Sequence, residues 1–288
     1  MSANHLIYAM LTHRGRVRQG NEDTCAAAPE IGAFVVCDGM GGAAAGEIAS
    51  NLAADTFLAN LAPAAGGRGK EAGGKSQARV NAARLNAAIQ AANQAVYQQS
   101  RQSPKLAGMG TTLVGLLHDP IVNGSGKRRT ASDHTNSRVT DPPTLWLGHV
   151  GDSRAYRRRK GKLEQLTHDH SLVEEQVRAG HITAEQAASS PMRNLITRAI
   201  GSQPTVEAEL QSHRPQQNDI YLLASDGLSH EVEDEEISQI LGEIPKPPTK
   251  ASLTAACEAL ITAANRNGGH DNITVLLVAV LPELVRVK

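Results

Sequence analysis

The stretch Ala33-Phe34-Val35-Val36-Cys37-Asp38-Gly39 joins a short apolar run to an aspartate and a glycine. Three other aspartates, Asp152, Asp226 and Asp271, stand beside similar apolar runs elsewhere in the chain. Runs of this length, bounded by Gly and Asp, are typical of buried strands. If the strands lie side by side with these ends together, the four carboxylates converge. The pattern therefore predicts a strand-rich core with an acidic site at one edge.

Converging carboxylates indicate a metal site. Two carboxylates about 4 Å apart repel by roughly 4 kcal/mol at an effective dielectric of 20, and hard cations such as Mg²⁺ or Mn²⁺ remove that repulsion. Taken alone, Asp38-Gly39 or Asp226-Gly227 is more often a plain turn, because Gly tolerates positive φ. The repeated placement favours the metal site instead. Arg18, followed closely by Glu22 and Asp23, adds the cation and further anions of a phosphate–metal site.

Several longer motifs contain these residues. In chain order they are Arg18-Gln19-Gly20-Asn21-Glu22-Asp23, Val36-Cys37-Asp38-Gly39-Met40-Gly41-Gly42, Met109-Gly110-Thr111-Thr112, Val150-Gly151-Asp152-Ser153-Arg154, Leu166-Thr167-His168-Asp169-His170-Ser171, Leu223-Ala224-Ser225-Asp226-Gly227-Leu228 and Gly269-His270-Asp271-Asn272-Ile273-Thr274. Each is weak evidence alone. Together and in this order, nearly end to end, they resemble the metal-dependent serine/threonine protein phosphatases of type 2C, in their bacterial branch.

The resemblance implies a fold and a set of metal ligands. The expected fold is α+β, a four-layer αββα sandwich of two packed, mainly antiparallel sheets flanked by helices. Asp38 is expected to bridge two Mn²⁺ or Mg²⁺ ions, with the backbone carbonyl of Gly39 on one ion and Asp226 and Asp271 on the other. Asp152 resembles the ligand of a third, weaker ion, and a role beside the ligands without metal contact is an equal alternative.

The resemblance also assigns roles around the ions. Arg18 is the expected phosphate clamp, since a planar guanidinium can donate two parallel hydrogen bonds to phosphoryl oxygens; an isolated Arg is more often a surface cation. Glu22, Asp23 and Asn272 are expected to orient the site without binding metal directly. Met40 stands where animal members carry a histidine that is a suspected leaving-group acid. Methionine cannot donate that proton, which leaves water at the metal site as the alternative.

The implied function is hydrolysis of phosphoserine and phosphothreonine in proteins by water activated at the metal site. A bacterial serine/threonine kinase is the expected opposing partner. Two alternatives stay open: a phosphohydrolase of a small phosphoester, and a catalytically silent regulator that binds phosphoproteins. Loss of a metal aspartate would be the sequence mark of the silent regulator, and all four aspartates are present.

Composition narrows the class of protein. The 288 residues, 40% of them hydrophobic, can form one large domain over 1–288. Equal numbers of basic and acidic residues, 29 of each, and 2% aromatic residues argue against a nucleic-acid partner. The apolar run from Leu6 to Leu11 lacks a basic leader, and no stretch approaches the roughly 20 apolar residues that span a bilayer. We therefore expect a cytoplasmic monomer without a membrane partner.

Periodicity predicts the main elements. Helices are expected over Ala43–Leu61, Gln77–Ser100 and Ser252–Asn267, and strands over Phe34–Cys37, Thr111–Leu117, Leu145–Val150, Ala155–Arg158, Ile220–Ala224 and Ile273–Val280. Flexible segments are expected at about 62–75 and 119–143. The second contains the basic cluster Lys127-Arg128-Arg129, either a solvated loop or a docking element for an acidic partner.

A flap beside the active site is expected at about 168–191. Its first residues, His168-Asp169-His170, could bind a transition metal but lack the further ligand pair of a zinc site, which favours a surface or flap role. The rest of the segment is either a lid that carries specificity or a structural helix pair.

Overall fold

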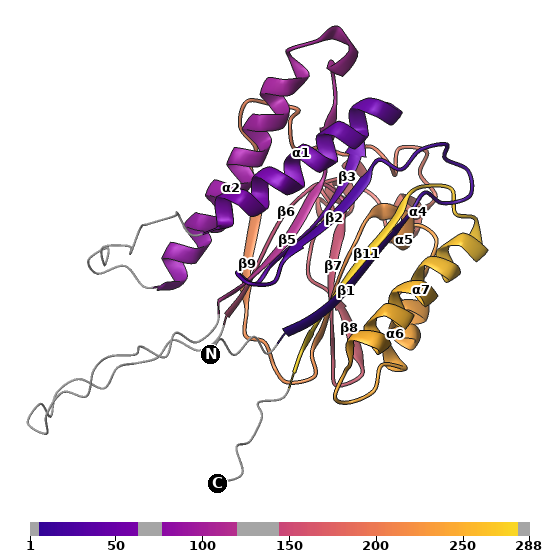
Figure 1. Ribbon diagram of the computed structural model, residues 1–288. Helices are drawn as coiled ribbons and strands as arrows, with labels where there is room; N and C mark the ends of the chain where they lie inside the picture. Colours follow the sequence, from indigo (N-terminus) through magenta and orange to yellow (C-terminus); the bar gives the residue numbers. More distant parts are fainter. Residues whose placement is uncertain (1–5, 63–76, 120–143, 282–288) are drawn as a thin grey trace, which may run out of the picture.

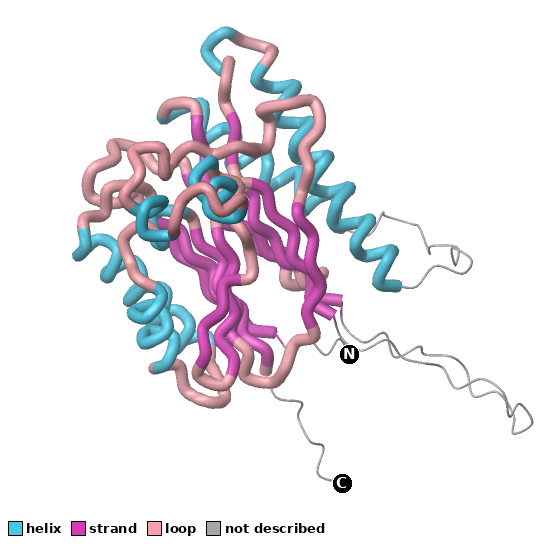
Figure 2. The backbone as a smooth tube through the Cα atoms, turned by 180° about the vertical axis from the view of Figure 1, so that it is seen from behind, coloured by secondary structure: helices cyan, strands magenta, loops and turns pink. Residues whose placement is uncertain are grey.

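Two antiparallel sheets lie face to face, and helices cover the outer face of each (Figures 1 and 2). The computed structural model describes residues 6–62, 77–119 and 144–281. The predicted α+β, four-layer αββα sandwich is therefore confirmed. The expected flexible segments at about 62–75 and 119–143, with the basic cluster Lys127-Arg128-Arg129, lie outside the described residues apart from their edges.

The chain alternates between the two sheets in blocks of one to five strands. In spatial order, the first sheet contains β1 (Leu6–His13), β11 (Ile273–Val280), β10 (Ile220–Ala224), β7 (Arg154–Arg159) and β8 (Lys162–Gln165). The second contains β2 (Asp23–Ala28), β3 (Ala33–Met40), β5 (Leu113–Asp119), β6 (Thr144–Val150) and β9 (Glu209–His213), and the short β4 (Gly110–Thr111) pairs with β3. This alternation places sequence-distant strand ends at one edge of the sandwich.

The outer face of each sheet is covered mainly by two helices. Helices α1 (Ala43–Leu61) and α2 (Gln77–Ser100) pack on the second sheet, followed by the 3₁₀ turn η1 (Pro104–Leu106). The short α5 (Asp226–Ser229), with α6 (Asp234–Gly242) and α7 (Lys250–Asn267), packs on the first sheet. Helices α3 (Leu172–Arg178) and α4 (Ala184–Ala188) belong to the expected flap region. Among the described helices, none is both long and apolar enough to cross a lipid bilayer.

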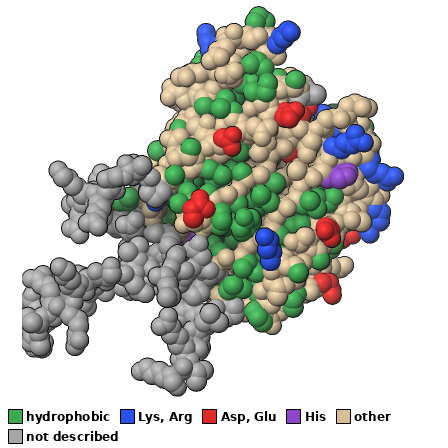
Figure 3. Space-filling model, viewed as in Figure 1, with side chains coloured by type: hydrophobic (Ala, Val, Ile, Leu, Met, Phe, Trp, Pro, Cys, Tyr) green, Lys and Arg blue, Asp and Glu red, His purple; other side chains and the backbone are tan. Residues whose placement is uncertain are grey.

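Strand β11 explains why the C-terminal apolar run lacks alternation. All eight of its residues are buried, because Leu276 and Val278 face the other sheet while Val275 and Leu277 face the α7 layer. A strand covered on both faces needs apolar side chains at every position. On the face that carries β1, hydrophobic side chains gather along the centre of the surface (Figure 3), and β1 leaves Met10 partly exposed at the sheet edge.

The structure corrects two boundaries and adds four strands that the sequence did not predict. Asp38 does not follow the end of its strand: β3 continues to Met40 because Asp38 still pairs with Asp23 and Gly39 with Thr111. Helix α7 begins at Lys250, because Thr249 rather than a later residue forms the reciprocal capping box. Strands β1, β2, β8 and β9 were not predicted, since β1 is an apolar run without alternation and the other three are short, alanine-rich or polar.

Gly115 gives a direct test of the packing between β5 and α1. A Cβ atom at this position would lie 2.6 Å from Cζ of the buried Phe57. We expect Gly115→Ala to lower the free energy of unfolding by about 1–3 kcal/mol through overpacking, measured by urea denaturation. Adding Phe57→Leu should recover part of that loss, because the smaller side chain leaves room for the methyl group. Strictly additive effects of the two substitutions would contradict this contact.

Candidate metal centre

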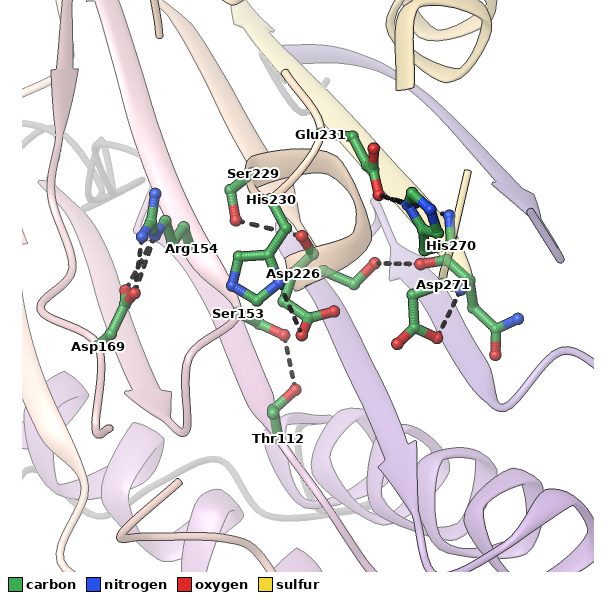
Figure 4. A network of polar contacts seen from close by, with 12 residues as sticks. Thr112, Ser153, Arg154, Asp169, Asp226, Ser229, His230, Glu231, His270 and Asp271 are labelled. Atoms are coloured by element: carbon green, nitrogen blue, oxygen red, sulfur yellow. Dashed lines mark hydrogen bonds and ion pairs between the residues drawn. The ribbon is translucent and has the colours of Figure 1, made fainter. Parts of the chain in front are cut away.

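The four aspartates come from both sheets and meet at one edge of the sandwich. Asp38 lies on β3 and Asp152 follows β6, both in the second sheet. Asp226 follows β10 and opens α5, and Asp271 precedes β11, both in the first sheet. The charge of Asp226 is among those that raise the pKa of Asp38, so these two carboxyl groups lie close together. Figure 4 shows Asp226 and Asp271 beside each other, so the fold gathers residues that the sequence separates widely.

Burial and mutual repulsion make this cluster unfavourable without a cation. Loss of hydration, followed by the charges of Asp23, Asp226 and Asp152, raises the pKa of Asp38 well above its usual range. Burial and the charge of Asp271 raise the pKa of Asp226 to about 6, and burial and Asp226 raise that of Asp152 to about 7. Every shift favours the protonated form, so the carboxylates need a compensating positive charge.

Two orphaned oxygens show that the residues fit divalent metal. Oδ1 of Asp226 and Oδ1 of Asp23 are buried and have no hydrogen-bond partner among the described residues. A buried carboxylate oxygen without a partner is costly unless an ion or water satisfies it. The Asp226 side chain keeps 16% exposure, which leaves the cluster open to solvent. Its donors are oxygen atoms, the ligands that Mg²⁺ and Mn²⁺ prefer, so the predicted ions suit this set.

Gly39 allows an unusually close approach of three chain segments. A Cβ atom at Gly39 would lie 2.2 Å from the carbonyl oxygen of Gly46 and 2.5 Å from that of Glu22. At Gly46, in α1, a Cβ would lie 1.8 Å from Oε2 of Glu22. Any larger residue at either position would push Glu22 and β3 apart. The two glycines therefore let Glu22 lie close to the strand that carries Asp38. Such closeness suits its expected role, which is to orient the site without binding metal directly.

Asn272 joins the N-terminal segment to the metal centre. Its side chain accepts a hydrogen bond from the Glu22 N–H at 2.7 Å and donates to the carbonyls of Arg14 and Gly20. Its own N–H donates to Oδ1 of Asp271 at 2.8 Å. Asp23, also expected to orient the site without binding metal, is buried. Its Oδ2 accepts a hydrogen bond from Ser225 at 2.7 Å. These contacts fix the backbone of Glu22 and the carboxyl groups of Asp23 and Asp271.

Arg18 lies at the rim of the cluster. Its guanidinium donates to Oδ2 of Asp271 at 2.6 Å, and its side chain is 51% exposed. That hydrogen bond is the main reason that the pKa of Arg18 is raised. The geometry leaves part of the planar donor group open to solvent beside the acidic cluster, where a phosphate would enter.

Two residues with direct contacts to the centre were missed as site residues. Thr112 accepts a hydrogen bond from the Asp38 N–H at 2.9 Å and exchanges one with Ser153 at 2.7 Å, so it joins Asp38 to the Asp152 turn. His230 places Nδ1 3.4 Å from Oδ2 of Asp226 (Figure 4). The available signal was its spacing, since positions i and i+4 share a face of a helical turn.

Known proteins match both the sequence and the fold. Residues 9–273 fit the family model described as protein phosphatase 2C. The chain belongs to the protein phosphatase 2C family. It is 38% identical over 276 residues to the serine/threonine protein phosphatase PstP of Mycobacterium tuberculosis, covering 96% of this chain and 45% of that protein. The chain thus spans about half the length of that relative. A serine/threonine phosphatase of Listeria monocytogenes is 35% identical, with 93% of each chain covered.

Solved structures extend the match to three dimensions. The crystal structure of the M. tuberculosis phosphatase PstP aligns with a TM-score of 0.75 at 36% identity, over 96% of this chain and 99% of that one. A structure of the PstP catalytic domain in complex with two manganese ions aligns with a TM-score of 0.73 at 35% identity, over 96% and 99% of the two chains. Metal dependence is a property of this family, and Asp38, Asp226 and Asp271 as the ligands remain predictions.

Substitution of Asp226 should reveal the carboxylate repulsion as a pH effect. Its folded pKa of about 6 lies above the unfolded value of about 3.9, so its stabilising contribution is present at low pH and is lost as pH rises through 6. With chelator present, the free energy of unfolding of wild type should therefore fall by about 1 kcal/mol relative to that of Asp226→Asn between pH 5 and 7.5, measured by urea denaturation. Comparing the two proteins cancels the histidines that do not touch Asp226, and His230→Asn in both proteins removes the one that does.

Mn²⁺ provides the control for this experiment. At pH 7.5 the ion should stabilise wild type more than Asp226→Asn, because it binds the ionised carboxylate. A relative stability that does not change with pH, or a variant that gains as much from Mn²⁺ as wild type, would contradict the assignment of Asp226.

Proposed function

We propose that this protein hydrolyses phosphoserine and phosphothreonine in proteins in a reaction that depends on Mn²⁺ or Mg²⁺. The observation that carries the proposal is the cluster of carboxylates from both sheets, with orphaned oxygens and a half-exposed arginine at its rim. The names of the bacterial relatives and the two manganese ions of the PstP complex support it.

In this proposal the chain holds two cations through a small set of oxygens. Asp38, the backbone carbonyl of Gly39, Asp226 and Asp271 would hold them, with Asp38 as the shared ligand. When bound, the ions supply Lewis-acid chemistry that activates water and neutralises phosphoryl charge. Asp152 is the proposed ligand of a third, weaker ion. Glu22, Asp23 and Asn272 keep these ligands oriented, since they contact neighbouring backbone and side chains rather than the cluster's open side.

Arg18 binds and orients the phosphoryl group in this proposal. Its hydrogen bond to Asp271 holds the guanidinium plane at the rim, and the remaining N–H groups can donate to phosphate oxygens. Met40 lies beside the cluster on β3 and carries no transferable proton. The leaving serine or threonine oxygen therefore takes its proton from water in the site.

The proposal extends to partners and organisation. We infer a serine/threonine kinase as the opposing enzyme and as one of the substrates. We also infer a cytoplasmic monomer without nucleic-acid partners, consistent with the balanced charge. We infer a single domain over 1–288 with a flap at about 168–191, where α3 and α4 lie.

An assay of phosphate release tests the function. We expect turnover of a phosphothreonine peptide with Mn²⁺ and none with chelator, and loss of about 100-fold or more in folded Asp38→Asn and Asp226→Asn proteins. Turnover of only a small phosphoester would favour the rival phosphohydrolase, and binding of the phosphopeptide without turnover would favour the silent regulator. Full activity in either variant would contradict the ligand assignment.

Replacing Arg18 tests the phosphate clamp separately. Charged hydrogen bonds contribute about 1.5–3 kcal/mol each, so Arg18→Ala should lower kcat/KM by about 10- to 100-fold at saturating Mn²⁺. Arg18→Lys should recover little, because an ammonium group cannot form the two parallel bonds. The matched control is Arg16→Ala, since Arg16 contacts the Asn265 carbonyl instead of the acidic cluster. Equal losses of kcat/KM in the Arg16 and Arg18 variants would contradict the assignment of Arg18 as the phosphate-binding residue.

A further inference from the structure

The turn that carries Asp152 has little conformational freedom. Gly151 has a φ of 104°, in the region that favours glycine, and a Cβ atom there would lie 2.6 Å from Cγ2 of Thr112. Ser153, on the other side of Asp152, is held by its hydrogen bond with Thr112. The direction of the Asp152 side chain therefore depends on how the backbone of Gly151 is held.

Both backbone polar groups of Gly151 are hydrogen-bonded to one residue, His170. The Gly151 N–H donates to Nδ1 of the imidazole at 3.2 Å, and the His170 N–H donates to the Gly151 carbonyl at 3.0 Å. The next residues reinforce the contact, because Arg154 forms a bidentate pair with Asp169 at 2.8–3.1 Å (Figure 4). The Asp152 turn and the segment at 169–170 are thus joined at two adjacent points.

The same histidine closes the base of the flap. Its carbonyl accepts a hydrogen bond from the Thr197 N–H at 2.7 Å, and Leu172 donates to the Leu195 carbonyl at 2.8 Å. Ser171 and Ile196 form an isolated antiparallel bridge between these bonds. The two ends of the flap therefore come together at the residue that also holds Gly151.

The ring of His170 is suited to accept a hydrogen bond. Its side chain is 1% exposed and stacks on His149, with centroids 4.6 Å apart and planes 19° apart. Burial, followed by His149 and Arg198, lowers the pKa of His170 to about 3, so the ring is neutral near neutral pH. The Gly151 N–H at Nδ1 is nearer than the Arg198 N–H, which lies 3.4 Å from Nε2, so Nδ1 keeps its lone pair. The proton is on Nε2, 3.8 Å from Oε2 of Glu209.

A transition-metal site is the competing interpretation of this cluster. His149, His170 and Glu209 place ligand atoms within 4.8 Å of one another, which supplies the ligands that His168-Asp169-His170 lacked in sequence. Two contacts argue against it. Nε2 of His149 faces the His168 carbonyl at 2.9 Å and must donate a proton there, and the guanidinium of Arg198 lies 3.4 Å from Nε2 of His170. A metal ion bound through the two Nε2 atoms would face two protonated nitrogens and a fixed positive charge.

We propose that His170 is a positioning residue that couples Asp152 to the flap. Its hydrogen bonds to Gly151 set the direction of the Asp152 carboxylate, and its carbonyl ties this turn to both ends of the flap. Cation binding at Asp152 and ordering of the flap therefore strengthen each other, since binding free energies are reciprocal. This inference rests on the proposed function only in taking Asp152 to be a cation ligand.

Three substitutions of His170 distinguish the role of Nδ1 from that of Nε2. In His170→Asn, the amide oxygen can take the place of Nδ1 and accept the Gly151 N–H. In His170→Gln, the amide reaches the position of Nε2 and leaves Gly151 without its acceptor, and His170→Phe removes both polar atoms while keeping a ring. Positioning through Gly151 predicts that Asn preserves the coupling and that Gln and Phe remove it.

The readouts are Mn²⁺ titration by calorimetry and hydrogen exchange of residues 172–195 with and without Mn²⁺. In wild type and His170→Asn, Mn²⁺ should increase protection of the flap. In His170→Gln and His170→Phe, the weakest Mn²⁺ site should lose about 10-fold or more in affinity, and the flap should no longer respond. Thermal unfolding of each variant identifies proteins that fail to fold.

The Asp152→Asn background excludes a merely structural role. There, His170→Phe should cause no further change in the Mn²⁺ response of the flap, whereas general destabilisation would persist. If all three His170 variants behave alike, or the wild-type flap does not respond to Mn²⁺, the coupling is wrong even though Mn²⁺ binds. A wild-type protein that binds no Mn²⁺ would instead overturn the proposed function.

Discussion

Electrostatic repulsion among closely placed carboxylates is the constraint on which this structure depends. Asp38, Asp152 and Asp226 are all held where loss of hydration and neighbouring charges favour their protonated forms. A protein that required only stability would replace such a cluster with apolar residues. The cluster has a physical reason if divalent cations bind it. The repulsion destabilises the metal-free protein, and bound cations would offset that repulsion. In the proposed function, divalent cations held by these carboxylates would relieve the repulsion and stabilise the fold around them.

The sandwich supplies the rigidity that such a site needs. Asp38 and Asp152 are carried by one sheet, and Asp226 and Asp271 by the other, so packing between the sheets sets the distances among them. Local hydrogen bonds complete the alignment. Thr112 holds the backbone of Asp38 and the turn beyond β6, and Asn272 holds the N-terminal segment that carries Glu22 and Arg18. Metal ligands on strand ends and short turns are positioned more accurately than ligands on long loops.

Sequence patterns predicted what is encoded locally. Helices α1 and α2 begin and end where predicted, because their apolar spacing is regular and breakers flank them. The acidic residues of the centre stood out because each adjoins an apolar run. The cluster of His149, His170 and Glu209 could not be predicted in the same way, since the register of β6 against β9 pairs His149 with a residue 60 positions away. His230 was not predicted as a site residue for a related reason: the sequence does not show which side chains lie near a single histidine in space.

Anomalous diffraction at the manganese edge from crystals grown with Mn²⁺ tests the central claim most directly. The account predicts two strong peaks bounded by the carboxylates of Asp38, Asp226 and Asp271, with Asp38 between them, and a weaker third peak beside Asp152. Peaks located elsewhere, or a cluster that binds no manganese while the aspartates remain in contact, would contradict it.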